Sequence, residues 1–226
     1  MKLRIKPGKR YTIIGRTGSG KSVLMMRLIE SYTQKPIVIL NSKEDGDISA
    51  LADGKNGVEV NNVDDMLKAV KDRYEYVIIT PPTSELDKPE ILDNYILQMY
   101  LTNRPHLFVI DELYMIHNNN RAYQGLLALL TRGRSKKMSY IGCVQRPAGI
   151  SRTAISEADE FFIFRLKDNR DKKVVWDIGL DMPENIEQYC FYHSDGETSR
   201  VFAPIPFAEK PPEPEYEKTF NKPVRR

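Results

Sequence analysis

The feature that most constrains this chain is a short glycine-rich stretch near its N-terminus. It matches the phosphate-binding pattern G-x-x-x-x-G-K-[ST] at every fixed position, and its residues are Gly15, Arg16, Thr17, Gly18, Ser19, Gly20, Lys21 and Ser22. In such a loop the glycines let successive backbone N–H groups point at phosphate oxygens, and the following helix adds the positive potential of its N-terminus. The pattern therefore predicts that Lys21 reaches the β- and γ-phosphates of a nucleotide and that the Ser22 hydroxyl binds Mg²⁺.

The segments on either side of this loop favour the same interpretation. Residues 11–14 are mostly β-branched or aromatic, as in a strand, and residues 23–32 carry apolar side chains at the spacing of a helix that packs on a sheet. A glycine-rich turn that matched the pattern by chance would not need these neighbours. We therefore expect the chain to bind a nucleoside triphosphate.

Apolar runs alternate with helical patterns along the rest of the chain. Strands are expected at 36–40, 76–80, 107–112, 139–145 and 160–166, and helices at 63–73, 89–103, 121–132 and 171–178. The expected hairpin joins 190–193 to 199–202, residues 1–6 resemble an edge strand, and residues 47–57 resemble a loop. This order predicts an α/β fold with a mainly parallel sheet, flanking helices and a C-terminal β-hairpin.

The composition changes close to residue 205. We expect residues 1–205 to form one domain with a substantial core, whereas residues 206–226 are rich in Pro, Glu and Lys and are expected to be flexible. The 34 basic and 31 acidic residues leave a net charge of only +3, so any nucleic-acid surface must come from a local cluster. Neither a membrane-spanning run nor a signal peptide is evident in the sequence, and we do not expect secretion.

Polar residues end two of the expected strands. A buried strand over 107–110 would deliver Asp111 to Mg²⁺, and the adjacent Glu112 could polarise the attacking water. A strand that merely ends in solvated acids is the alternative, and the complete phosphate loop upstream favours the catalytic interpretation. Gln145 ends the next strand, where an amide could hold the lytic water or sense the γ-phosphate; as an isolated residue it would indicate only a cap or a turn.

The basic cluster at 132–137 contains two candidates for an arginine finger. Arg132 or Arg134 would enter the site of a neighbouring subunit and offset charge in the transition state. The alternative is a solvated basic turn at the C-terminus of a helix, where cations are favoured. The nearby Lys136 and Lys137 could instead contact nucleic-acid phosphates.

Taken in order, these motifs resemble those of the FtsK–HerA superfamily of DNA-pumping P-loop ATPases. The residues that carry the resemblance are the phosphate loop, Asp111-Glu112, the turn at 133–135 and Gln145, and it covers about residues 8–205. The compact chain is similar to the genome-packaging ATPases of tailless icosahedral viruses with an internal membrane. Lys43 also stands where many superfamily members carry the lysine of an Asp-Pro-Lys turn, although Asn41 and Ser42 replace the first two positions.

The resemblance has consequences for fold, activity and partners. It implies a RecA-like motor domain that hydrolyses ATP with Mg²⁺ and packages a double-stranded DNA genome into a viral capsid. It also implies a ring, expected to be a homo-hexamer, with each site between subunits and an arginine supplied in trans. A capsid or viral membrane protein would be the docking partner, and the host cytoplasm or the packaging vertex of the virion would be the location.

Three other functions fit parts of this sequence. A nucleotide or small-molecule kinase shares the phosphate loop and the size, but Glu112 directly after Asp111 suits water activation better than transfer to a hydroxyl. A conjugation or filamentous-phage assembly ATPase is a second alternative, although a membrane anchor is usual there. A protein that binds nucleotide without turnover is the third, and it would not need Lys21 together with both acids.

Overall fold

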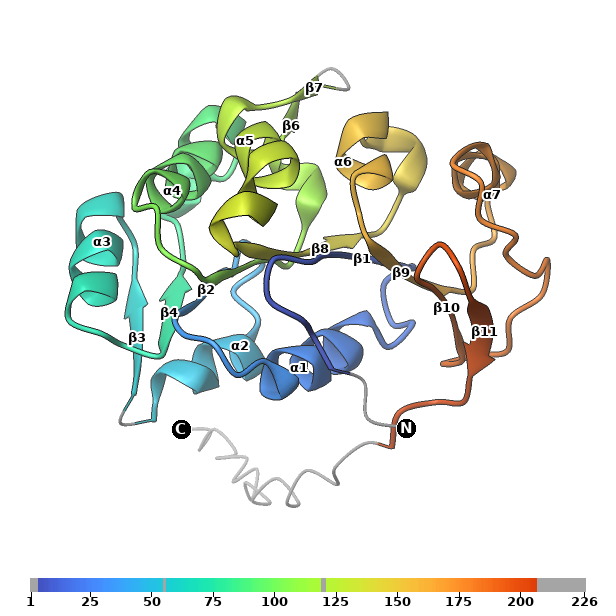
Figure 1. Ribbon diagram of the computed structural model, residues 1–226, viewed down its shortest axis with the longest axis horizontal. Coiled ribbons are helices and arrows are strands. Elements are labelled where there is room, and N and C mark those ends of the chain that lie inside the picture. The colour runs from blue at the N-terminus through green and yellow to red at the C-terminus, as the bar shows by residue number, and fades with distance from the viewer. Residues whose placement is uncertain (1–3, 55, 119–120, 207–226) are drawn as a thin grey trace, which may run out of the picture.

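A twisted, mainly parallel β-sheet forms the centre of the molecule (Figure 1). The computed structural model describes residues 4–54, 56–118 and 121–206. Within these residues the sheet has nine strands: β1 (Arg10–Ile14), β2 (Ile37–Leu40), β3 (Gly57–Val60), β4 (Tyr76–Ile79), β5 (Leu107–Ile110), β8 (Ser139–Val144), β9 (Glu160–Phe164), β10 (Phe191–Ser194) and β11 (Ser199–Phe202).

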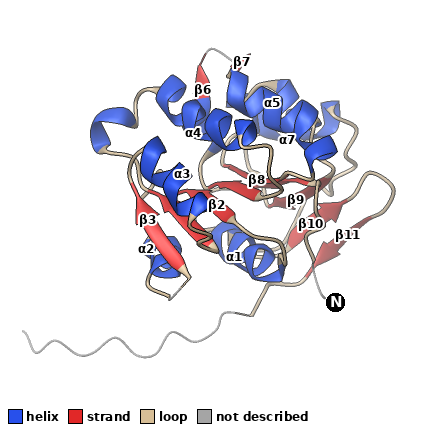
Figure 2. Cartoon of the chain, turned by 60° about the vertical axis from the view of Figure 1, so that its left-hand side comes forward, coloured by secondary structure: helices blue, strands red, loops and turns tan. Residues whose placement is uncertain are grey.

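Helices cover both faces of this sheet (Figures 1 and 2). They are α1 (Lys21–Ser31), α2 (Gly46–Ser49), α3 (Val63–Lys71), α4 (Pro89–Leu101), α5 (Gln124–Arg132), α6 (Arg152–Ser156) and α7 (Asn169–Asp177). A short 3-10 helix, η4 (Gly133–Lys136), follows α5, and a small ribbon pairs β6 (His117–Asn118) with β7 (Arg121–Ala122). None of the helices within the described ranges combines the length and apolar composition that crossing a bilayer requires.

The core has two layers because successive strand side chains point to opposite faces of the sheet. On β2, Val38 and Leu40 belong to the apolar cluster that includes side chains of α4 and α5. Their neighbours Ile37 and Ile39 belong to the cluster that includes side chains of α1. All four residues are fully buried, which explains why β2 appears in the sequence as a continuous apolar run rather than an alternating one.

The strand order positions the functional residues. It runs β11-β10-β9-β1-β8-β5-β2-β4-β3, and all pairs are parallel except those that β10 makes with β9 and β11. The carboxyl ends of β1, β8, β5 and β2 therefore lie side by side at one edge of the sheet. The RecA-like α/β architecture with a C-terminal hairpin, predicted from the sequence, is confirmed.

The prediction of an N-terminal edge strand is wrong for the residues that the structure describes. Residues 4–6 are irregular, because side chains satisfy their backbone. The Ile5 N–H donates to Ser31 Oγ at 3.2 Å, and the Lys6 N–H donates to the Tyr11 hydroxyl at 2.7 Å. Ile5 is nevertheless buried, so the segment covers one end of α1 without joining the sheet.

Two other segments form elements of a different kind from those that the sequence predicts, whereas most expected helices and strands differ only by a few residues at their ends. The segment at 47–57 contains most of α2 and the first residue of β3. The edge strand β3 was missed because only its last residue, Val60, is buried, so its apolar pattern is weak. The helix expected at 121–132 begins at Gln124, because the two residues at 121–122 pair as β7. Residues 207–226, most of the expected flexible tail, lie outside the described residues.

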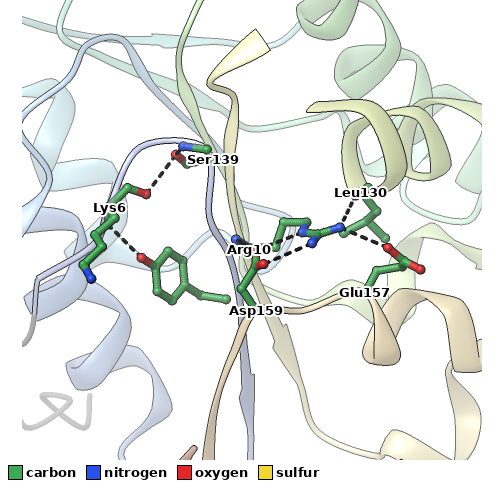
Figure 3. Close-up of polar contacts among 8 residues, drawn as sticks. Lys6, Arg10, Leu130, Ser139, Glu157 and Asp159 are labelled. Carbon is green, nitrogen blue, oxygen red and sulfur yellow. Dashed lines mark hydrogen bonds and ion pairs between the residues drawn. The ribbon is translucent and has the colours of Figure 1, made fainter. Parts of the chain in front are cut away.

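Arg10 at the start of β1 holds the opposite edge of the sheet (Figure 3). Its Nε donates to Asp159 Oδ2 at 3.0 Å and its Nη2 to Asp159 Oδ1 at 3.1 Å. Its Nη1 donates to Glu157 Oε2 at 3.0 Å and to the carbonyl oxygen of Leu130 at 2.6 Å. A guanidinium suits this position because it can donate in several directions in one plane. These bonds connect β1 to α5 and to the start of β9.

Candidate active site

The glycine-rich loop joins the end of β1 to the start of α1. It begins beside β8, where the Gly15 N–H donates to the carbonyl oxygen of Val144 at 3.0 Å. A side chain at Gly15 would lie 2.8 Å from Phe164 Cβ, and Gly20 has a backbone φ of +103°. Both positions therefore require glycine, the first for close approach and the second for its conformation. The loop presents the N-terminus of α1 to a cavity of about 660 Å³.

Lys21 lies inside this loop. Its side chain is largely buried, and Nζ donates to the carbonyl oxygen of Arg16 at 2.9 Å. Burial lowers the pKa of Lys21 from its ordinary value, because the charged form loses hydration there. The same cavity is lined by the adjacent Ser22, by Thr17 and by Asp111. Bound phosphate would give Lys21 a stronger, oppositely charged partner than a backbone carbonyl.

Asp111 follows β5 and is fixed by the turn after β2. Its Oδ1 accepts hydrogen bonds from Ser42 Oγ at 2.7 Å and from the Ser42 N–H at 3.1 Å, and its Oδ2 accepts from the Lys43 N–H at 3.2 Å. Burial raises the pKa of Asp111, and the Ser42 hydrogen bonds oppose that shift. A buried carboxylate at the mouth of a phosphate loop fits a divalent cation, which would stabilise its charged form.

The two carboxylate oxygens of Glu112 differ in their hydrogen-bond partners. Oε2 accepts from Lys43 Nζ at 2.8 Å and from Gln145 Nε2 at 2.5 Å. Oε1 is buried and has no hydrogen-bond partner among the described residues. An unpaired buried acceptor is costly, and a water molecule placed against a γ-phosphate would satisfy it. Glu112 is therefore held on one oxygen, while its other oxygen is buried and has no partner among the described residues.

Gln145 connects the acid to the phosphate loop. Besides donating to Glu112, its amide accepts a hydrogen bond from Thr17 Oγ1 at 3.0 Å. Gln145 follows the last residue of β8, so the bond joins two neighbouring strand ends. The residue thus lies at the position that the sequence predicts, and its side chain touches two parts of the site.

The donor set fits Mg²⁺ bound together with a nucleotide. The Ser22 hydroxyl and the Asp111 carboxylate are the oxygen ligands that Mg²⁺ prefers. Among the described residues no group of three His, Cys, Asp or Glu side chains could hold a metal on its own. The remaining ligands would be phosphate oxygens and water, as is usual for this ion.

The structure does not bring Arg132 and Arg134 to this site. Arg132 is the last residue of α5 and Arg134 lies in η4, at the opposite edge of the sheet from the phosphate loop, and both are exposed. Within the same cluster, Lys136 Nζ lies 3.8 Å from the ring centroid of Tyr100. Either arginine could therefore reach a nucleotide only in another copy of the chain.

The fold and the site together define a RecA-like P-loop ATPase, and comparison with known proteins identifies the family. The chain is 33% identical over 169 residues to the DNA packaging ATPase P9 of Enterobacteria phage PRD1, covering 74% of this chain and 68% of that protein. The chain therefore belongs to the family of viral DNA-packaging ATPases. No protein-family model matches it.

Solved structures share the fold at much lower identity. The genome packaging NTPase B204 of Sulfolobus turreted icosahedral virus 2, in complex with sulfate, has a TM-score of 0.69 at 17% identity, over 89% of this chain and 98% of B204. The pCW3 conjugation coupling protein TcpA has a TM-score of 0.54 at 17% identity, over 87% of this chain and 60% of TcpA. These likenesses concern the fold, and the family assignment rests on the sequence.

The contacts of Gln145 lead to a kinetic prediction. Replacing Gln145 with Ala removes a donor to Glu112 and the acceptor for Thr17, so the carboxylate that we expect to activate water keeps Lys43 as a partner but loses the contact that fixes its orientation towards the phosphate loop. We expect kcat for ATP hydrolysis to fall by about 10²-fold with KM within about threefold, because the lost contacts orient the reacting groups. Steady-state phosphate release measures both constants.

Gln98→Ala is the matched control, because Gln98 lies on α4, away from the residues that line the cavity, and its side chain donates to Asn94 on the same helix. It should leave both constants unchanged. A wild-type kcat in Gln145→Ala would remove the residue from the catalytic machinery. A large rise in KM with unchanged kcat would instead assign it to nucleotide binding.

Proposed function

We propose that this chain uses Mg²⁺-dependent ATP hydrolysis to move double-stranded DNA into a viral capsid. The observation that carries the proposal is its 33% identity to a DNA packaging ATPase over 169 residues. Lys21 and Asp111 line one cavity, and Glu112 is bonded to Lys43 and Gln145, which line the same cavity; this arrangement supports the hydrolytic half of the proposal. The domain at 1–205 would be the motor.

Each residue of the site would have a distinct task. Lys21 exchanges the Arg16 carbonyl for phosphate oxygens, and Ser22 and Asp111 hold Mg²⁺. The ion, when bound, neutralises charge on the phosphates. Glu112 accepts the proton of the attacking water on Oε1, while Gln145 fixes Oε2. The loop of Gly15, Arg16, Thr17, Gly18, Ser19 and Gly20 would surround the phosphates, with the Gly15 N–H held by the sheet and other backbone N–H groups of the loop turned to the phosphate oxygens.

A cation from a neighbouring subunit would offset the charge that develops on the phosphate in the transition state. Arg134, or Arg132, would supply this cation, which requires a closed ring with head-to-tail contacts. We propose a homo-hexamer with double-stranded DNA in its centre. The ring would work in the host cytoplasm or at the packaging vertex, docked on a capsid or viral membrane protein; recovery of the full chain with purified empty particles tests this location.

The first test is ATP turnover with and without long double-stranded DNA. We expect DNA to raise turnover several-fold, because a motor couples hydrolysis to its track. Lys21→Ala should abolish turnover, and Glu112→Gln should bind ATP but hydrolyse it at least 10³-fold more slowly, because an amide cannot take the proton from water. Lys68→Ala and Glu90→Gln, exposed lysine and glutamate positions on α3 and α4, are the matched controls.

Two outcomes would contradict this function. Near-normal turnover in Lys21→Ala would show that the phosphate loop is not the active site. Turnover that ignores DNA but rises with a nucleoside or another small acceptor would indicate a kinase with the same fold.

Mixing two inactive variants tests the arginine in trans. Arg134→Ala retains Glu112, and Glu112→Gln retains the arginine, so a mixed ring contains some complete sites. At equal amounts about a quarter of the sites should combine an intact acid with an intact neighbouring arginine, and turnover should recover to about that fraction. Arg132→Ala is tested in the same way. An Arg134→Ala protein with full activity alone, or a mixture without recovery, would exclude the trans role of Arg134.

A further inference from the structure

The C-terminal hairpin returns both of its ends to the edge of the sheet that carries the phosphate loop. β10 is antiparallel to β9 and to β11, so Phe191 at its start lies opposite Phe164 at the end of β9 and opposite Phe202 at the end of β11. The residues just before β10 and just after β11 therefore meet beside the loop. Figure 1 shows the chain after β11 turning back towards the side of the sheet that carries α1.

These two segments close one end of the cavity at the phosphate loop. Phe164, Tyr189, Pro204 and Ile205 line it together with Gly18, Gly20 and Lys21. Phe164 and Ile205 belong to the apolar cluster packed around α1. The cavity thus has a polar end, with the residues that would hold phosphate and Mg²⁺, and an apolar end. A nucleotide is divided in the same way, into a charged triphosphate and a largely apolar base.

Tyr189 is the unusual residue at this end. Its side chain is 50% exposed, and its backbone has a φ of +63°, a conformation that a bulky residue rarely adopts. Its ring lies next to the loop, since Cδ1 would be 3.8 Å from a side-chain carbon placed on Gly20. An aromatic ring held beside a phosphate loop in a disfavoured backbone conformation is positioned for a ligand rather than for the core.

We propose that Tyr189 stacks on the nucleobase of the bound triphosphate, with Pro204 and Ile205 completing the base site. The inference rests on the proposed function, because it assumes that the phosphate loop binds a nucleotide. The four side chains at this end offer a flat ring and aliphatic surface, and the Tyr189 hydroxyl is their one hydrogen-bonding group. Recognition is therefore by stacking rather than by reading the edge of the base, so the site accepts adenine and guanine similarly.

Direct binding of two probes to the full chain tests the base site. Isothermal titration in Mg²⁺ compares AMPPNP, which carries a base, with inorganic tripolyphosphate, which does not. Tyr189→Ala should weaken AMPPNP by about tenfold, as expected for loss of one base–aromatic stack, and leave tripolyphosphate within twofold. Tyr189→Phe should bind both probes like the wild type. In the wild type, GMPPNP should bind within about fivefold of AMPPNP.

Trp176→Ala provides the matched control, because Trp176 is a partly exposed aromatic residue on α7 outside the residues that line this cavity. It should bind both probes normally. Wild-type AMPPNP affinity in Tyr189→Ala would overturn the inference, as would an equal loss in Tyr189→Phe, which would assign recognition to the hydroxyl. Equal weakening of tripolyphosphate in Tyr189→Ala would also overturn it, because the residue would then support the loop. Failure of the wild-type chain to bind either probe would overturn the proposed function itself.

Discussion

Parallel pairing of β1, β8, β5 and β2 is the constraint on which the site depends. Each strand delivers different chemistry at its carboxyl end: the phosphate loop, Gln145, the two acids and the Ser42-Lys43 turn. The register aligns these ends in pairs, with Ile14 opposite Val144 and Leu40 opposite Ile110, while β8 extends two residues beyond the point where Gly142 lies opposite Ile110. Hydrogen bonds across neighbouring strand ends then join the four segments. Carboxyl ends of parallel strands are the usual position of ligand sites in such sheets.

Charge in the site is arranged for a ligand that brings its own negative charge. Lys21 and Lys43 lie near the two acids, and the Glu112 carboxylate shares one oxygen between Lys43 and Gln145. Lys21 meanwhile donates to a backbone carbonyl oxygen. The charges of these buried groups are thus partly balanced within the protein, and a nucleotide with its cation would balance the rest. Such preorganised groups act strongly because they need little rearrangement during the reaction.

Much of the fold was predictable because its central strands are buried on both faces. The runs at 37–40, 76–79 and 107–110 are continuous and apolar, and turns or charged residues bound them. The phosphate loop and Asp111-Glu112 were predictable because their chemistry requires fixed local spacing. The edge strand β3 and the irregular N-terminus were not, because neither has a buried apolar pattern of its own.

The contacts between motifs could not be predicted. Lys43 reaches Glu112 only because β2 and β5 are neighbours, and chain order does not determine sheet order. The hydrogen bonds from Ser42 to Asp111 were missed for the same reason. A serine at the position of the proline in an Asp-Pro-Lys turn does not by itself indicate such a contact. Tyr189 lies far along the chain from the loop that it approaches, and its backbone conformation is visible only in three dimensions.

The most direct test of the central claim is displacement of a third strand from double-stranded DNA. A labelled triplex-forming oligonucleotide blocks the duplex, and a protein that moves along the duplex removes it. We expect the assembled chain to release the oligonucleotide with ATP and Mg²⁺ but not with AMPPNP, and Glu112→Gln to release none. An oligonucleotide that stays bound while the wild-type protein hydrolyses ATP at its DNA-stimulated rate would contradict translocation.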